Sequence, residues 1–426
     1  MVWLSRFRMA SIRAGAAAAG PSYRYICKSR FDNVFLRDTC TCSICVDPSS
    51  GQKHFSTGEI PLDVHPKSTT FDKADDSVTI TWTAAGTPDH VSRYSTHFLE
   101  QYSSPLLRYN AHWKFDVPEL LWNQQNLGPA LVRRDYADYL EDDRAFADIV
   151  LALYSCGMAF ITGAPAAEKA LDGEIVVEKI AQKIGYIKQT FYGKSWDVIS
   201  IPDAKNIAYT SVNLPLHMDL LYYESPPGIQ LLHCISNNAE GGESVYADCY
   251  NAASYIYNND LEAFKVLCSF PIVFHYDNDG HKYMCTRPLI ELDPFYQQLH
   301  PLMPPYRIKC MNYSPPFQAP FEHFISQSDL EQNDLTENGE FRKFLHAYKL
   351  FESIIHSPSE QYEEKFEPGV IALFMNRRVL HSRREFKLAT TKQETQDLLL
   401  SGRWLKGTYL DIDSFYSKLR VLSALK

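Results

Sequence analysis

Two histidines and one aspartate of this sequence are spaced so that together they could bind a metal ion. In Leu214-Pro-Leu-His217-Met-Asp219 an imidazole and a carboxylate lie two residues apart, so on an extended strand both side chains point to the same side. His381 comes just after an apolar, strand-like run that ends at Phe374, and we expect it at the mouth of the same barrel. Two histidines and one carboxylate are the ligand set of non-haem Fe(II) oxygenases, and this set leaves positions open for a co-substrate and O2. An isolated His-x-Asp pair is more often a surface or capping pair, so the prediction needs support from other parts of the chain.

A cation for 2-oxoglutarate is the second requirement of such a site, because one end of this acid chelates the iron and the other end needs a fixed partner. The planar fork of an arginine suits a carboxylate. We predict Arg403 for this role, because it follows His381 on a segment that reads as the next strand. Its competitors lie closer to His381, and we interpret several of them as solvated turn residues: Arg377, Arg378, Arg383 and Arg384.

Three thiols within six positions form a second cluster with metal-binding chemistry. These are Cys40, Cys42 and Cys45, whereas the rest of the ten cysteines are scattered, a pattern that fits a reducing compartment. Structural zinc takes four nitrogen or sulfur ligands in a tetrahedron. Four histidines nearby could supply the fourth ligand: His54, His65, His90 and His97. We favour His90, which follows the strand ending at Trp82 in a turn-like Thr-Pro-Asp-His; the alternative is a loop of reduced cysteines without metal.

Short strands dominate the segments that must position these side chains. Apolar or alternating runs bounded by Gly, Pro, Asn or Asp cover residues 77–82, 229–234, 244–248, 308–312 and 370–374. Helical patterns cover residues 135–154, 173–185, 251–268 and 338–356. Many strands with a few helices outside them predict a mainly β fold with flanking helices, a closed sandwich or barrel rather than a doubly wound sheet. Neither GxGxxG nor GxxxxGK[ST] occurs, so dinucleotide and P-loop chemistry lack their usual support.

Changes in composition along the 426 residues predict three parts. Residues 1–26 form an arginine-rich leader that is typical of a mitochondrial presequence or, alternatively, a frayed tail. Residues 27–110 form a small sheet domain with the cysteine cluster, and residues 111–426 form the larger domain. The formal net charge of -9, without a basic block, argues against a nucleic-acid partner. The longest apolar stretch, 149–161, is too short and too interrupted to span a membrane.

In several ordered motifs the chain resembles the gamma-butyrobetaine and trimethyllysine dioxygenases, within the broader taurine dioxygenase-like Fe(II)/2-oxoglutarate oxygenases. The motifs are Phe35-Leu-Arg-Asp-Thr-Cys40-Thr-Cys-Ser-Ile-Cys45, Pro88-Asp-His90, Thr190-Phe-Tyr-Gly-Lys-Ser-Trp196, Ala208-Tyr-Thr-Ser, His217-Met-Asp219, Pro227-Gly-Ile-Gln-Leu-Leu-His-Cys234 and Val379-Leu-His381. The resemblance implies a double-stranded β-helix (jelly-roll) catalytic domain plus a small zinc-binding N-terminal β domain. It also implies the cofactors: Fe(II) at His217, Asp219 and His381, 2-oxoglutarate at Arg403, zinc at Cys40, Cys42, Cys45 and His90, and ascorbate as a candidate reductant.

Substrates of this family carry a trimethylammonium group in an aromatic cage, and the matching positions are Tyr192, Trp196, Tyr209 and Tyr409. A quaternary ammonium cannot donate a hydrogen bond, so ring faces are the fitting receptor. The alternative is that these rings are ordinary core residues of strands. Asn206 and Asn312 match positions that handle the substrate carboxylate in the gamma-butyrobetaine enzymes.

The choice of substrate is predicted from three further segments. Pro226-Pro-Gly and residues 410–421 look more like the gamma-butyrobetaine enzymes, whereas Tyr222-Tyr223 leans toward the trimethyllysine enzymes. The favoured reaction is hydroxylation of gamma-butyrobetaine to L-carnitine with O2 as co-substrate. Alternatives are trimethyllysine or another betaine-like or secondary metabolite and, from a different class, a zinc-binding interaction protein with a dead oxygenase site. The resemblance further implies a homodimer, and the leader favours the mitochondrion over the cytoplasm.

Overall fold

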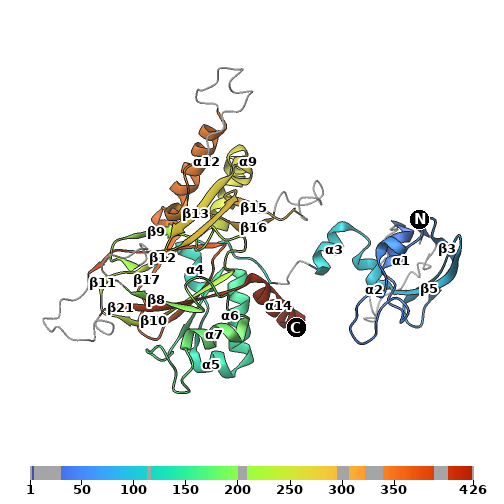
Figure 1. Cartoon of the computed structure of the whole chain (residues 1–426), viewed down its shortest axis with the longest axis horizontal. Coiled ribbons are helices and arrows are strands. Elements are labelled where there is room, and N and C mark those ends of the chain that lie inside the picture. The colour runs from blue at the N-terminus through green and yellow to red at the C-terminus, as the bar shows by residue number, and fades with distance from the viewer. Residues whose placement is uncertain are drawn as a thin grey trace, which may run out of the picture. The chain divides into compact units, whose positions relative to one another are not determined.

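The computed structural model describes Val2–Trp3 and residues 30–112, 117–199, 209–294, 307–321, 339–387 and 402–424. Contacts divide the chain into two units, Met1–Lys114 and Phe115–Lys426 (Figure 1). Most of the predicted leader lies outside the described residues; of it, Val2–Trp3 forms strand β1, which pairs with β2 (Arg30–Phe31). Within the described part of the chain no helix combines the length and apolar character that crossing a membrane requires.

The first unit is built on a three-stranded antiparallel sheet of β3 (His65–Asp72), β4 (Ser77–Ala84) and β5 (Thr87–Ser95). The expected strand is therefore present as β4, and its alternate residues Val78, Ile80 and Trp82 are buried, as one packed face of a sheet requires. Short helices complete the unit: α1 (Asn33–Asp38), η1 (Thr57–Glu59), α2 (Thr96–Gln101) and α3 (Pro105–His112).

The second unit contains two packed sheets. The larger has the strand order β6 (Arg133–Asp135), β7 (Met158–Thr162), β18 (Ile371–Met375), β10 (Ile229–Asn237), β21 (Arg403–Leu410) and β8 (Ser195–Ile199). The smaller has the order β17 (Gln361–Glu364), β12 (Ser244–Asp248), β19 (Val379–Arg383) and β9 (Leu214–His217). Tyr246 of β12 packs its ring 5.5 Å from that of Phe374 in β18, so the two sheets face each other. The short strands β11 (Glu240–Gly241) and β20 (Phe386–Lys387) form a separate antiparallel pair; β11 precedes β12 in the sequence, and β20 follows β19.

Helices cover the outer face of the larger sheet, as expected for a mainly β fold with flanking helices. They are α5 (Tyr136–Glu141), α6 (Asp143–Ser155), α7 (Val176–Ile184) and α14 (Ile412–Ala424). A further helix, α4 (Gln124–Ala130), lies beside β17 and buries Leu127 in the cluster that contains Phe160 and Tyr246. The single helix expected over 135–154 is two helices, because Asp142 ends α5 and caps α6 through the Arg144 N–H. Buried side chains of α6, α7 and α14 pack on Ile229, Leu231 and Leu373 of the sheet.

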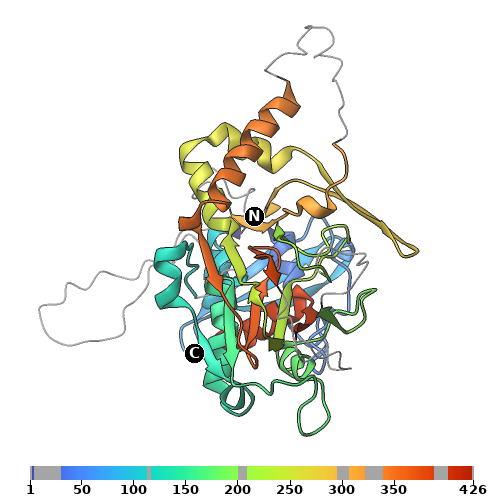
Figure 2. The same ribbon diagram turned by 90° about the vertical axis from the view of Figure 1, so that its left-hand side faces the viewer.

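A long insertion between β12 and β17 forms a separate layer (Figures 1 and 2). Its elements are α8 (Cys249–Asn259), α9 (Leu261–Ser269), β13 (Ile272–Asn278), β14 (His281–Arg287), β15 (Ile290–Leu292), β16 (Ile308–Met311), η3 (Pro315–Phe317), α12 (Glu340–Ile355) and η4 (Pro358–Glu360). One helix was expected over 251–268, but Asp260 ends α8 and caps α9. The layer packs on the residues that follow β9, and this contact shapes the candidate site.

Candidate active site

The two histidines of the predicted metal site face each other across a strand pair. Strand β9 pairs with β19 in a register that sets His217 opposite His381, and their ring centroids are 4.2 Å apart. Asp219 follows β9; its Oδ1 lies 3.2 Å from His217 Nε2, and its Oδ2 lies 3.9 Å from His381 Nε2. One ligand atom from each of the three side chains lies within 4.8 Å of the other two. The structure therefore brings this set of residues together.

The environment favours the electron-donating forms of Asp219 and His381. Desolvation alone would raise the pKa of Asp219, but its close contacts with His217 and His381 and the hydrogen bond from Tyr409 hold this pKa well below its usual range. Burial, with the neighbouring His217, lowers the pKa of His381 to about 3, so its imidazole is neutral. The Nδ1 of His217 lies 2.8 Å from the Pro215 carbonyl oxygen, which orients Nε2 toward Asp219. Two imidazoles and a carboxylate converging on one point fit the donor set that non-haem Fe(II) uses.

The four predicted cage residues border the same cavity as the three candidate iron ligands: Tyr192, Trp196, Tyr209 and Tyr409. The hydroxyl of Tyr409 donates a hydrogen bond to Asp219 Oδ2 at 2.7 Å. Its ring stacks on Trp196 with a centroid distance of 4.1 Å, and Tyr192 lies 6.1 Å from Trp196. Gly407 is required here, because a Cβ atom at this position would come within 2.6 Å of the indole. The aromatic rings and the candidate metal ligands thus border one cavity.

Three further aromatic residues of this cavity were not predicted as site residues: Tyr222, Tyr246 and Phe317. The ring centroids of Tyr222 and Phe317 are 5.3 Å apart. Tyr222 reaches the cavity because Leu220 has a left-handed backbone with φ of 57°, which turns the chain just after Asp219. A leucine carries no sequence signal for this conformation, since non-glycine residues rarely adopt it. Phe317 comes from the inserted layer, and no motif marks it.

Arg403 and Arg383 bring two cations to the cavity. Both side chains are buried, at 5% and 4% exposure. Burial lowers the pKa of each to about 10, and Arg403 adds to this effect on Arg383, so both remain charged at neutral pH. No ion pair joins Arg403 to an acidic side chain within the described ranges, and its Nε has no hydrogen-bond partner there. Because an enclosed cation needs a counter-charge, this arrangement fits an anionic ligand such as the distal carboxylate of 2-oxoglutarate.

The interpretation of several arginines near His381 as solvated turn residues is wrong. Only Arg384 of this group is well exposed, with 47% of its side chain accessible. Arg378 is enclosed, pairs with Asp248 at 3.0 Å, and donates to the Ser155 carbonyl at the end of α6. Arg377 lies 3.2 Å from Glu291 of the inserted layer. Helix α6 and the insertion cover the turn before His381. Arginines that lie next to this turn in the sequence are therefore not exposed to solvent.

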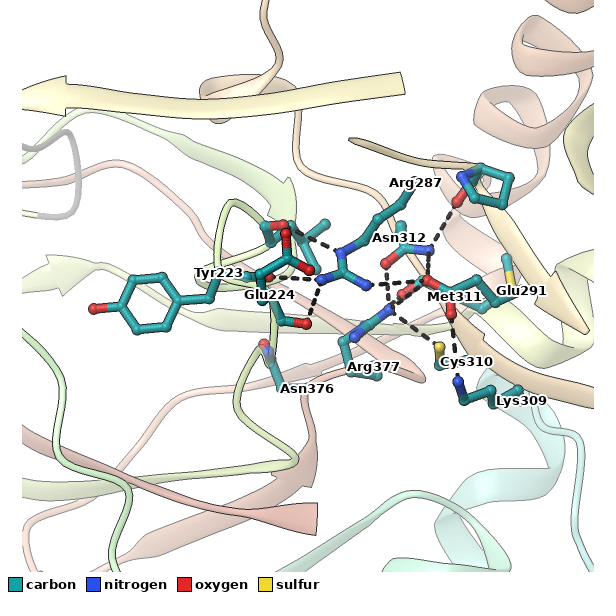
Figure 3. Close-up of polar contacts among 12 residues, drawn as sticks. Tyr223, Glu224, Arg287, Glu291, Lys309, Cys310, Met311, Asn312, Asn376 and Arg377 are labelled. Carbon is teal, nitrogen blue, oxygen red and sulfur yellow. Dashed lines mark hydrogen bonds and ion pairs between the residues drawn. The ribbon is translucent and has the colours of Figure 1, made fainter. Parts of the chain in front are cut away.

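The two predicted carboxylate-binding asparagines have different outcomes. Asn206 lies outside the described residues. Asn312 is buried but does not border the cavity. Its amide donates to the Pro288 carbonyl at 2.7 Å and to Glu291 at 3.0 Å, and its oxygen accepts from Arg377 (Figure 3). This network engages the whole side chain, and the structure does not bring it to the other site residues.

In the first unit, the three cysteines and His90 converge. The Nε2 of His90 lies 3.3, 3.7 and 3.4 Å from the Sγ atoms of Cys40, Cys42 and Cys45. The expected turn at His90 is wrong: it lies within β5, paired with Trp82. Burial and the nearby Arg37 lower the pKa of His90, which keeps the imidazole neutral as a ligand must be. Among the described residues the other candidate histidines do not join the cluster. Three sulfur atoms and one nitrogen fit a four-coordinate zinc ion.

Comparison with known proteins places both units. Residues 24–100 match the family "Gamma-butyrobetaine hydroxylase-like, N-terminal", and residues 123–409 match "Taurine catabolism dioxygenase TauD, TfdA family". The chain is 33% identical over 391 residues to dioxygenase str8 of Strobilurus tenacellus, covering 91% of this chain and 84% of that protein.

Two relatives match the family predicted from the motifs. The chain is 28% identical over 394 residues to gamma-butyrobetaine dioxygenase of Pseudomonas sp. (strain AK-1), covering 92% of this chain and 91% of that one. It is 26% identical over 399 residues to mitochondrial trimethyllysine dioxygenase of Mus musculus, covering 92% and 83%. The predicted family and the enzyme class are confirmed. The chain belongs to the taurine catabolism dioxygenase TauD, TfdA family and is a non-haem Fe(II)/2-oxoglutarate-dependent dioxygenase.

Proposed function

We propose that the protein hydroxylates a C–H bond of a small trimethylammonium substrate, with gamma-butyrobetaine and its product L-carnitine as the first choice. The observation that carries the proposal is the contact between cage and metal site: Tyr409 donates to Asp219 while its ring stacks on Trp196. A quaternary ammonium held by these rings would place its neighbouring carbons beside the three candidate ligands. The gamma-butyrobetaine relative supports this substrate.

Each part of the cavity has a role in this reaction. Iron bound with 2-oxoglutarate supplies the activation of O2, and overall one oxygen atom enters the substrate C–H bond while 2-oxoglutarate becomes succinate and CO2. His217, Asp219 and His381 would hold the metal, and Arg403 would hold the distal carboxylate of 2-oxoglutarate. The rings of Tyr192, Trp196, Tyr209 and Tyr409 orient the cation and exclude water from it. Trimethyllysine is the second candidate, because it carries the same cation and the mouse relative bears its name.

The cage is tested with a neutral isostere of gamma-butyrobetaine in which a tert-butyl group replaces trimethylammonium. We expect kcat/KM to fall about 30-fold for this analogue, since a desolvated cation–π contact is worth about 2 kcal/mol. The measurement is hydroxylated product per unit time, with trimethyllysine in a parallel reaction. The Trp196→Leu variant should lose most of the preference for the cation. Equal turnover of both compounds by the unmodified protein would overturn the cage assignment.

We further propose that Cys40, Cys42, Cys45 and His90 bind a structural zinc ion. Their four donor atoms leave no open coordination position, and metal affinity at such a site contributes directly to folding. We expect Cys42→Ser to lower bound zinc from about one ion per chain to nearly none and to lower the melting temperature of the first unit. Elemental analysis and thermal unfolding measure both effects. Cys268→Ser in α9 is the matched control, and unchanged zinc in Cys42→Ser would contradict the assignment.

A further inference from the structure

Asn376 holds the backbone of Asp219 from both sides. It lies in the turn between β18 and β19 and is fully buried. Its Oδ1 accepts a hydrogen bond from the Asp219 N–H at 2.8 Å, and its Nδ2 donates to the Asp219 carbonyl at 2.9 Å and to the Pro227 carbonyl at 3.2 Å. The amide therefore uses both its donor and its acceptor on one residue, and that residue is the carboxylate of the candidate iron site.

The backbone of the segment that begins at Asp219 needs contacts that fix its conformation. Asp219 lies beyond the end of β9, so no strand pairing in the smaller sheet fixes its peptide groups. The next residue, Leu220, has the left-handed backbone that side chains other than glycine rarely adopt. Conformations of this kind persist where surrounding contacts over-determine them. Asn376 supplies two of those contacts, and Met218 adds a third through its N–H bond to the Tyr313 carbonyl at 2.9 Å.

The position of Asn376 couples two ligands of the metal site. It precedes His381 by a short turn and the first part of β19, and its own N–H bonds to the Gly228 carbonyl at 3.0 Å. The neighbouring Arg377 is fixed by Glu291, which also lies 3.4 Å from Arg287 (Figure 3). Arg287 in turn donates to the Tyr223 and Glu224 carbonyls at 2.6 and 2.7 Å. The loop after Asp219 is thus held at its metal end by Asn376 and at its far end by Arg287.

We infer that Asn376 is a positioning residue of the iron site, which sets the Asp219 carboxylate at the distance and direction that the metal requires. Asn376 does not border the cavity, and its amide contacts the backbone of Asp219 rather than the carboxylate. The inference rests on the assignment of iron to His217, Asp219 and His381. Side chains that orient metal ligands in this indirect way typically contribute 10- to 100-fold to metal affinity.

The test is an anaerobic titration of full-length protein, from which iron has been removed but not zinc, with Co(II), which is followed by the visible absorption of the bound ion, and with Fe(II). We expect Asn376→Ala to bind either metal about 10- to 100-fold more weakly and to show an altered Co(II) spectrum. Asn376→Gln keeps both the amide donor and the amide acceptor on a side chain that is one methylene longer, and it serves as the second variant; we expect its affinity to fall by a smaller factor. All samples carry zinc in the first unit, so that the added metal does not bind to the cysteine cluster.

Two controls separate positioning from general loss of stability. Asn251→Ala removes a partly buried side-chain hydrogen bond of similar length away from the cavity, in which Asn251 Nδ2 donates to Glu360 at 2.9 Å. Arg287→Met loosens the far end of the same loop. Both should melt at lower temperature and keep metal affinity within about 3-fold of the unmodified protein. Unchanged affinity in the folded Asn376 variants, or an equal loss in Arg287→Met, would overturn the inference. Failure of the unmodified protein to bind either metal would instead overturn the iron site itself.

Discussion

Replacing His217 or Asp219 by alanine is expected to reduce succinate formation from 2-oxoglutarate to the rate of metal-free protein. Each substitution leaves two protein ligands where the candidate site brings three within 4.8 Å. In Asp219→Ala the anionic ligand is lost, and Tyr409 also loses its hydrogen-bond acceptor. The measurement is succinate per minute together with iron bound per chain after anaerobic reconstitution.

The fold should survive these substitutions, because the contacts of the Asp219 carboxylate are made within the candidate site, with His217, His381 and Tyr409. Circular dichroism and zinc content report this directly. His346→Ala removes an exposed histidine of α12 and should leave both iron and succinate formation unchanged. An undiminished rate in His217→Ala or Asp219→Ala would remove the ligand assignment, whatever substrate is supplied.

Replacing Arg403 by glutamine is expected to raise the KM for 2-oxoglutarate about 100-fold. The guanidinium is buried and charged beside the metal site, and loss of a charge-assisted bond to a carboxylate costs about 3 kcal/mol. Arg403→Lys restores the charge without the planar fork and should recover part of the affinity. Steady-state rates at varied 2-oxoglutarate provide the measurement.

Two neighbouring arginines make this experiment specific. Arg384→Gln changes an exposed side chain paired with Glu363 and should leave the KM within about 2-fold. Arg383 also borders the cavity, so Arg383→Gln tests whether this arginine binds the carboxylate instead. A larger rise in Arg383→Gln than in Arg403→Gln would transfer the carboxylate site to Arg383.

The features that the sequence predicts well are those that local spacing determines. His217 and Asp219 lie two residues apart at a strand end, and Cys40, Cys42 and Cys45 lie within six positions, so each set converges whatever the rest of the fold does. The pairing of His381 with His217 across β9 and β19 depends on the strand order, which local patterns do not determine. Likewise the strand β4 follows from its alternating burial, whereas the helix breaks at Asp142 and Asp260 depend on capping by aspartates within longer apolar patterns.

The differences between prediction and structure have a common physical cause. Contacts with elements far away in the sequence determine the environment of these residues, and local patterns do not show such contacts. Arg377 and Arg378 follow a turn, yet Glu291 and Asp248 from distant elements enclose them. Asn312 carries an amide suited to a carboxylate, but Arg377 and Glu291 occupy it. His90 reads as a turn residue because of Pro88 and Asp89, whereas pairing with β4 makes it part of a strand. Tyr222 enters the cavity only through the left-handed Leu220.

The central claim is that one cavity couples 2-oxoglutarate decarboxylation to hydroxylation of a trimethylammonium compound. The most direct measurement is the ratio of succinate to hydroxylated product when Fe(II)-reconstituted protein acts on gamma-butyrobetaine under 18O2. The account predicts one succinate for each product, with one labelled oxygen atom in each molecule. Succinate that forms at the same rate with and without gamma-butyrobetaine, and no label in that compound, would contradict it.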